Sequence, residues 1–115
     1  MGLARLRPVE RIRRRPEFQQ VYNRGVRIRG RYSTLFMLPN NQTAGRLGIA
    51  ATKKLGGAVQ RNRAKRLIRE VFRRNKVAAG LDVVVVPRRE LFEASLTALE
   101  TEYRAALARR RPQQP

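Results

Sequence analysis

The feature that most constrains the fold is the run of four valines from Val83 to Val86, which stands between Asp82 and Pro87. An uninterrupted apolar run of this length is typical of a central strand covered on both faces. Such a strand requires neighbouring strands and helices that cover the sheet. With 115 residues, the chain has room for one core of this kind and little room for a second domain.

The other patterns predict an α+β fold with the order αβββαβα, arranged as a two-layer sandwich. Helices are expected over residues 16–24, 58–75 and 90–109, and strands over residues 31–38, 46–52 and 83–86, with a shorter strand allowed over 26–29. We expect strand 46–52 to run antiparallel to strand 31–38, because their connection is short. In the last helix, the side chains expected to face the core are Phe92, Leu96, Leu99, Tyr103 and Leu107.

Positive charge is concentrated in the first two thirds of the chain. The sequence has 27 Lys and Arg against 8 Asp and Glu, a net charge of +19, and residues 1–76 hold 21 of the cations and only 3 of the acids. Arg outnumbers Lys by 23 to 4, which favours bidentate contact with phosphate and stacking on bases. We therefore expect a basic N-terminal arm over residues 1–15, one RNA-binding domain over residues 16–109 and a polar tail over residues 110–115.

The residue types that usually carry catalysis are missing or scattered. The chain has no His and no Cys, so the common proton shuttle, the thiol nucleophile and thiolate metal sites are excluded. Its few acids do not cluster near the basic region, as a two-metal nuclease requires. No apolar run is long enough to cross a membrane, and residues 1–9 hold no apolar block of secretory length. We expect a cytoplasmic protein with no catalytic residue or metal site of its own and no membrane partner.

A basic loop that contains glycine, residues 53–57, leads into the predicted helix 58–75. One side of this helix is apolar through Ala64, Leu67, Ile68, Val71 and Phe72. Seven of the fourteen residues from 61 to 74 are Arg or Lys, and the one acid among them, Glu70, is expected to pair with Arg66 or Arg74. Backbone N–H groups of such a loop and the N-terminus of the helix favour phosphate, so this segment is expected to bind an RNA backbone.

The sequence resembles the protein component of bacterial ribonuclease P. The stretches that carry the resemblance are Glu17-Phe18, Arg46 to Ile49, Lys53-Lys54, Gly56, Ala58-Val59, Arg61 to Arg69 and Asp82 to Val84. The resemblance implies a left-handed βαβ crossover and an RNA subunit that carries out catalysis with Mg²⁺, held mainly by that RNA. It also implies a role in removing the 5′ leader of precursor tRNA, with the catalytic RNA and precursor tRNA as partners and no obligate protein partner.

The resemblance further divides the site residues into two sets. Those expected to bind the catalytic RNA are Lys53, Lys54, Arg61, Asn62, Arg63, Lys65, Arg66 and Arg69. Those expected to bind the leader are Phe18, Tyr22, Thr34, Phe36, Lys65 and Arg69. Periodicity alone favours core packing for Phe18 and Phe36, whereas the resemblance places both rings in the leader cleft.

Two further readings stay open from the sequence. A ribosomal protein or an RNA chaperone without an enzyme partner fits the length and the charge equally well, and a self-contained nuclease would have to cleave RNA without an RNA subunit. Among the remaining acids, Asp82 is expected to cap or end the turn before the valine strand. The acids of the last helix are expected to lie on its solvated surface.

Overall fold

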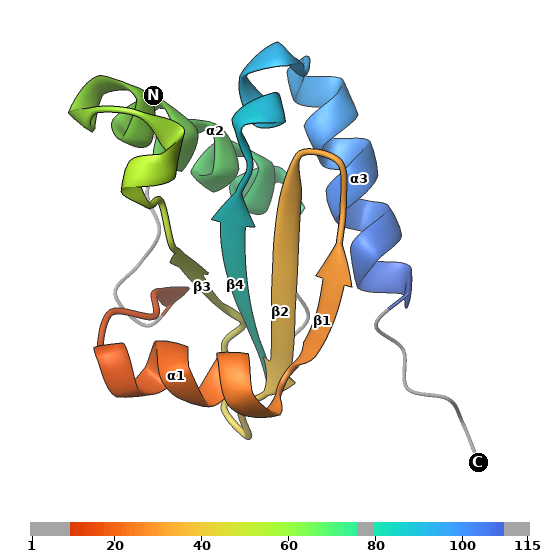
Figure 1. The fold of residues 1–115 in the computed structure, drawn as a ribbon. Helices are drawn as coiled ribbons and strands as arrows, with labels where there is room; N and C mark the ends of the chain where they lie inside the picture. Colours follow the sequence, from red (N-terminus) through yellow and green to blue (C-terminus); the bar gives the residue numbers. More distant parts are fainter. Residues whose placement is uncertain (1–9, 76–79, 110–115) are drawn as a thin grey trace, which may run out of the picture.

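The computed structural model describes residues 10–75 and 80–109, which form one four-stranded sheet with helices on both faces (Figure 1). The elements are α1 (Arg15–Arg24), β1 (Val26–Arg29), β2 (Ser33–Pro39), β3 (Arg46–Ile49), η2 (Lys53–Leu55), α2 (Ala58–Arg74), β4 (Leu81–Pro87), η3 (Arg89–Glu93) and α3 (Leu96–Arg109). The predicted order αβββαβα is confirmed, including the short strand over 26–29. None of the described helices has the length and apolar character that crossing a membrane requires.

The valine run forms the buried centre of the sheet, as predicted. The strand order is β1-β2-β4-β3, so that β4 lies between β2 and β3, and Val83, Val84 and Val85 are buried. The expected antiparallel direction of the two preceding strands is confirmed, but the two strands are not neighbours in the sheet. β2 and β3 run in opposite directions, but β4 separates them, pairing antiparallel with β2 and parallel with β3. The physical reason is that the valine strand is apolar on both faces and therefore occupies the internal position.

The connection from β3 through α2 to β4 is left-handed, as the resemblance implies. β3 and β4 are adjacent and parallel, and α2 lies behind the sheet in Figure 1 while β4 lies to the right of β3. Crossovers between parallel strands are right-handed in nearly all proteins. With this left-handed connection, α2 passes the β3 edge of the sheet. The candidate site lies at that edge.

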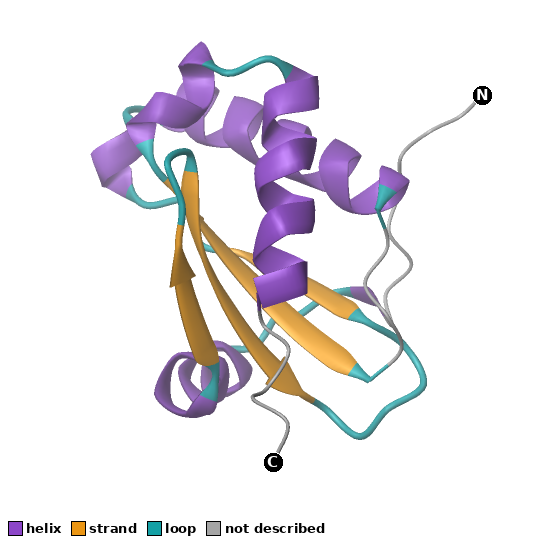
Figure 2. Cartoon of the chain, turned by 90° about the vertical axis from the view of Figure 1, so that its right-hand side faces the viewer, coloured by secondary structure: helices purple, strands orange, loops and turns teal. Residues whose placement is uncertain are grey.

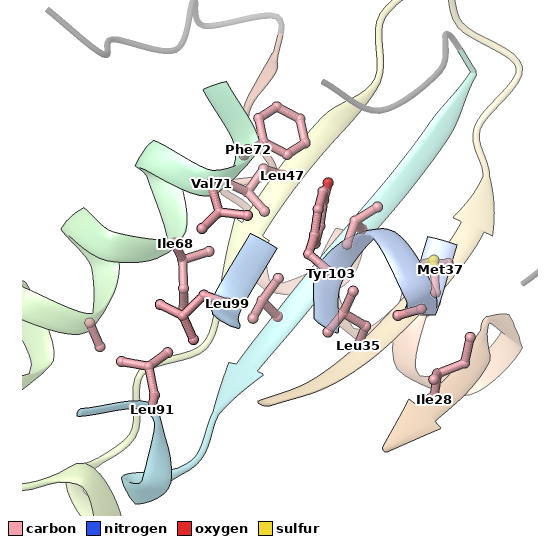
Figure 3. Close-up of a cluster of buried hydrophobic side chains, with 14 of the residues drawn as sticks. Ile28, Leu35, Met37, Leu47, Ile68, Val71, Phe72, Leu91, Leu99 and Tyr103 are labelled. Atoms are coloured by element: carbon pink, nitrogen blue, oxygen red, sulfur yellow. The ribbon is translucent and has the colours of Figure 1, made fainter. Parts of the chain in front are cut away.

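Two helices cover one face of the sheet and form the main core with it. Phe72 of α2 and Tyr103 of α3 belong to the same buried cluster as Leu35 and Met37 of β2, and Phe72 lies near Leu47 of β3 (Figure 3). The predicted apolar side of α2 is confirmed. α1 lies on the opposite face and crosses only the end of the sheet near Leu38 (Figures 1 and 2). Beyond α1, no described helix covers this second face.

The helix predicted over residues 90–109 is in fact two elements. A short 3₁₀ turn, η3, follows β4, and the chain is extended at Ala94 before α3 begins. Ser95 starts the second element, because its Oγ accepts a hydrogen bond from the backbone N–H of Ala98 at 3.1 Å, as an N-cap does. The buried side of α3 is formed by Leu99, Tyr103 and Ala106, whereas Leu107 is only partly buried.

Glu102 of α3 is a structural link rather than a solvated surface acid, which corrects the expectation for this helix. Its carboxylate accepts hydrogen bonds from the backbone N–H groups of Arg31, Tyr32 and Ser33 at 2.7, 3.0 and 3.1 Å. Arg31 and Tyr32 lie in the turn from β1 to β2 and Ser33 begins β2, so the carboxylate accepts hydrogen bonds from three consecutive backbone donors at this turn. A Cβ at Gly30 would lie 2.5 Å from Cδ of Glu102, so a side chain there would push the carboxylate away from these hydrogen bonds.

Tyr103→Phe is expected to stabilise the protein by about 1 kcal/mol, since an unpaired buried hydroxyl costs free energy. Tyr103 is buried in the main core, and its hydroxyl oxygen has no hydrogen-bond partner among the described residues. Burial also raises the pKa of this phenol above its ordinary value. Urea unfolding of the two proteins, followed by circular dichroism, measures the difference. A less stable variant would mean that the hydroxyl makes a favourable interaction.

Candidate nucleic-acid interface

The basic loop is shaped by a polar cap and by glycines. The backbone N–H of Lys54 donates to Oγ1 of Thr52 at 3.3 Å, which begins the turn η2. Gly56 ends this turn with a φ of 129°, a backbone conformation that favours glycine. Gly57 then stands at the N-cap of α2. β3 therefore ends at Ile49, earlier than the predicted 46–52, because the chain turns away from the sheet toward this loop.

The residues predicted to bind the catalytic RNA lie along η2 and over residues 61–69 of α2. We call them the basic surface: Lys53, Lys54, Arg61, Asn62, Arg63, Lys65, Arg66 and Arg69. Lys53, Lys54, Arg63 and Arg66 are exposed, and Arg61 is half-buried. The helix anchors this surface through its opposite side, where Ala64, Ile68, Val71 and Phe72 are buried. Packing in the core thus holds a row of cations in fixed positions toward solvent.

Ion pairing divides the cations of α2 into two groups. Near the C-terminal end, Glu70 pairs with Arg73 at 2.7 Å and with Arg74 at 2.9 Å, and these arginines hold the pKa of Glu70 at about 2. The predicted Glu70–Arg74 pair is therefore confirmed, and Arg73 is a second partner. Within the described parts of the chain, no carboxylate forms an ion pair with a cation of the basic surface. Among the residues that the structure describes, no acid neutralises the charge of this surface.

The three predicted aromatic residues of the leader set meet on the second face of the sheet. Phe18 and Tyr22 of α1 have ring centroids 6.4 Å apart, and the ring of Tyr22 meets that of Phe36 edge-on at 4.9 Å. All three side chains are half-buried, so each ring packs against the protein and also retains an exposed part. Partial burial raises the pKa of the Tyr22 phenol. We call these three residues the aromatic cluster.

α1 is held on the sheet by a network of charged groups. Arg46 of β3 donates from Nε and Nη2 to both carboxylate oxygens of Asp82 at 2.8 and 2.7 Å, and from Nη1 to Glu17 of α1 at 3.1 Å. The side-chain amide of Asn40 donates to Asp82 at 2.6 Å. Asp82 is thus the buried partner of an arginine rather than a turn cap, which corrects the expectation for it.

Glu17 also completes the start of α1. Its carboxylate accepts hydrogen bonds from the backbone N–H groups of Arg13 and Arg14, both at 3.3 Å, at the helix N-terminus. Burial opposes the ionisation of this carboxyl. The hydrogen bonds from Arg14, Arg46 and Arg13 outweigh burial and hold the pKa of Glu17 below its ordinary value. The direction of α1, and with it the position of Phe18, is therefore set by this carboxylate.

A cavity of about 360 Å³ at the β3 edge brings residues of the two predicted sets together. Its lining is Arg11, Ile12, Arg13, Phe18, Leu47, Ile49, Lys65 and Arg69. A Cβ at Gly48 would lie 2.8 Å from Cζ of Phe18, so the absence of a side chain at Gly48 lets the ring lie against β3. The cavity thus combines one aromatic ring with cations from α2. We call it the edge cavity.

Two arginines of the edge cavity, Arg11 and Arg13, are absent from the predicted site. Arg11 pairs with Leu47 in a parallel bridge, and the backbone N–H of Ile12 donates to the carbonyl of Leu47 at 2.9 Å. The described end of the predicted arm, residues 10–14, therefore lies along β3; residues 1–9 are outside the described residues. The signal in the sequence is Ile12, an apolar residue between arginines, whose side chain is buried.

Thr34 and Phe36 do not line the edge cavity with Lys65 and Arg69. They lie on the second face of the sheet, where each stands opposite an arginine of β1 that the sequence analysis missed. The register pairs Arg27 with Phe36 and Arg29 with Thr34, and paired residues of antiparallel strands share a face. Both arginines are exposed. The alternation of Arg with Val and Ile in β1 is the signal that could have identified them.

Comparison with known proteins gives consistent similarities. The model of the family Ribonuclease P matches residues 6–111. The ribonuclease P protein component of Thermotoga maritima is 40% identical over 86 residues, which cover 73% of this chain and 74% of that protein. That of Syntrophus aciditrophicus is 44% identical over 85 residues, covering 72% and 71%.

Solved structures show the same similarity. The RNase P protein from Thermotoga maritima superposes with a TM-score of 0.77 at 33% identity, covering 87% of this chain and 96% of that chain. The RNase P protein of Staphylococcus aureus superposes with a TM-score of 0.76 at 30% identity, covering 89% and 95%. The α+β fold and the order of its elements are thus shared with proteins of known structure.

Proposed function

This chain belongs to the ribonuclease P protein family, and we propose that it binds the catalytic RNA through the basic surface and the 5′ leader of precursor tRNA through the aromatic cluster and the edge cavity. As a ribonuclease P protein component, it is a subunit of an endoribonuclease in which the RNA carries out catalysis. The reaction of this enzyme in tRNA processing is the removal of the leader from the 5′ end. These similarities support this function and not that of a ribosomal protein or an RNA chaperone.

The observation that carries the proposal for the basic surface is that no carboxylate of residues 10–75 and 80–109 forms an ion pair with its cations. Arg61 lies in the first turn of α2, where the positive end of the helix dipole makes a cation unfavourable, and this turn contains no acid. Stability of the free protein therefore does not explain the position of this charge. A polyanion that supplies phosphates does explain it, since each phosphate can accept two hydrogen bonds from one guanidinium.

The proposal for the leader rests on the combination of rings and cations on one side of the molecule. Phe18 offers a ring beside Lys65 and Arg69 in the edge cavity, and the aromatic cluster continues to Tyr22 and Phe36. Single-stranded RNA is bound in this way by many proteins, because bases stack on aromatic side chains while cations contact the backbone. Thr34 lies next to Phe36 on the same face and extends the surface along β2.

We place the Mg²⁺ that the resemblance implies on the RNA subunit. The residues that the structure describes include no group of three His, Cys, Asp or Glu side chains that could hold a metal ion. The buried Asp82 is already bound by Arg46 on both carboxylate oxygens. A cytoplasmic location, which the sequence analysis expects, fits a role in tRNA processing.

Reconstitution tests the proposed function. We expect the purified protein alone to leave precursor tRNA intact, and the protein combined with ribonuclease P RNA in Mg²⁺ to release the leader. The physical reason is that the chain has neither His nor Cys and no acid cluster among its described residues. The measurement is gel analysis of a 5′-labelled precursor. Leader release by the protein without RNA would contradict the proposal.

A further inference from the structure

One aromatic side chain of the β4–α3 connection lies beside the basic surface. The guanidinium carbon of Arg63 stands 5.7 Å from the ring centroid of Phe92, which is within the range of a cation–π interaction. Arg63 belongs to α2 and Phe92 to η3, so the contact joins two elements that are distant in the sequence. Helical periodicity predicts Phe92 only as part of a core-facing stripe. The contact with Arg63 is a second property of this ring.

The ring of Phe92 is held in place by its surroundings. The neighbouring Leu91 is buried, and Phe92 itself is half-buried against the main core. The exposed part of the ring lines a surface cavity of about 600 Å³ between the start of α2 at Gly57 and η3. A ring that is fixed on one side by the core can restrict a flexible arginine on the other side, which reduces the entropy that the arginine loses on binding.

An aromatic ring can position a guanidinium without occupying its N–H hydrogen-bond donors. Glu90 and Glu93 line the same cavity, yet within the described parts of the chain neither forms an ion pair with Arg63. A carboxylate would neutralise the charge and occupy the N–H donors, as Glu70 does for Arg73. The face of a phenyl ring accepts no conventional hydrogen bond, so all five N–H donors of Arg63 remain available for phosphate.

We infer that Phe92 is a positioning residue, which orients Arg63 for its contact with the catalytic RNA. The inference rests on the proposed role of the basic surface and adds to it a residue from outside that surface. It predicts that the contribution of Phe92 to RNA affinity is exerted through Arg63 and through no other residue.

A double-mutant cycle tests this inference with the full chain and ribonuclease P RNA. Phe92→Leu keeps an apolar side chain but removes the ring, and we expect the RNA to bind about two- to fivefold more weakly, as loss of an exposed cation–π contact implies. Phe92→Tyr retains the ring and is expected to bind like the wild type. Arg63→Gln is expected to weaken binding further than Phe92→Leu, and adding Phe92→Leu to Arg63→Gln should change nothing more.

A matched control comes from the other cation–π pair, in which the guanidinium carbon of Arg31 lies 5.5 Å from the ring centroid of Tyr32. Tyr32→Leu removes the same type of contact outside the basic surface and is expected to leave RNA affinity unchanged. Phe92→Leu overturns the inference if it binds like the wild type, or if it weakens binding equally with and without Arg63. If Arg63→Gln itself has no effect, the proposed role of Arg63 fails as well. Should Phe92→Leu not fold, reduced affinity of Phe92→Tyr would overturn the inference.

Discussion

Arg46→Met is expected to lower the free energy of unfolding by about 3–5 kcal/mol, because removing one partner of a buried ion pair leaves the other charge uncompensated. Asp82 is only 4% exposed, and it would retain one side-chain partner, the amide of Asn40. The substitution also removes the bond from Arg46 to Glu17, which ties α1 to the sheet. Urea unfolding followed by circular dichroism measures the loss.

The double variant Arg46→Met with Asp82→Leu provides the control. It removes both charges, so position 82 no longer buries a carboxylate without its arginine, and we expect the variant to recover part of the lost stability. A single variant within 1 kcal/mol of the wild type would mean that water or rearrangement compensates the charge of Asp82. The network would then not be what holds α1, and Phe18 with it, in place.

The second large effect is expected from combining Arg61→Gln, Arg63→Gln and Arg66→Gln on the basic surface. Affinity for ribonuclease P RNA should fall on the order of 100-fold or more, since each lost phosphate contact weakens binding several-fold. The dependence of log affinity on log salt should also become shallower, by about 0.7–0.9 for each contact removed. Binding measured over a series of salt concentrations gives both quantities.

The same helix provides a matched control for this experiment. Arg73→Gln with Arg74→Gln removes two arginines from α2, but both already pair with Glu70. We expect this variant to have a much smaller effect on affinity and on the salt dependence. An equal effect per arginine removed in the two sets would show that binding depends on net charge alone and would contradict a specific role for the basic surface.

Local periodicity was sufficient to predict most of the elements. The apolar side of α2 follows from residues three and four apart, and the two faces of β2 follow from alternation, which Leu35 and Phe36 illustrate with their opposite sides. The internal position of β4 in the sheet follows from its run of valines, which is apolar on both faces. These features depend on residues that are close in the sequence, so they can be predicted from its local pattern.

Contacts between distant residues could not be predicted in this way. The separation of β2 from β3 by β4 depends on a strand that follows more than thirty residues later. The bidentate pair of Arg46 and Asp82 and the bonds of Glu102 to the β1–β2 turn likewise join segments with no shared pattern. For the site, the motif indicated the basic surface, whereas Arg11 in the edge cavity depends on how the chain before α1 lies along β3.

We propose that the basic surface binds the catalytic RNA and that the edge cavity with the aromatic cluster binds the 5′ leader. The most direct test is the affinity of the assembled enzyme for tRNA with and without a 5′ leader. The variant is Phe18→Leu, which removes the ring from the edge cavity while keeping an apolar side chain beside Ile12. We predict that precursor tRNA binds about 5- to 150-fold more weakly, as the loss of 1–3 kcal/mol of stacking on one base implies, and that mature tRNA binds as before. Equal weakening for both tRNAs, or no change for either, would contradict a leader site at Phe18.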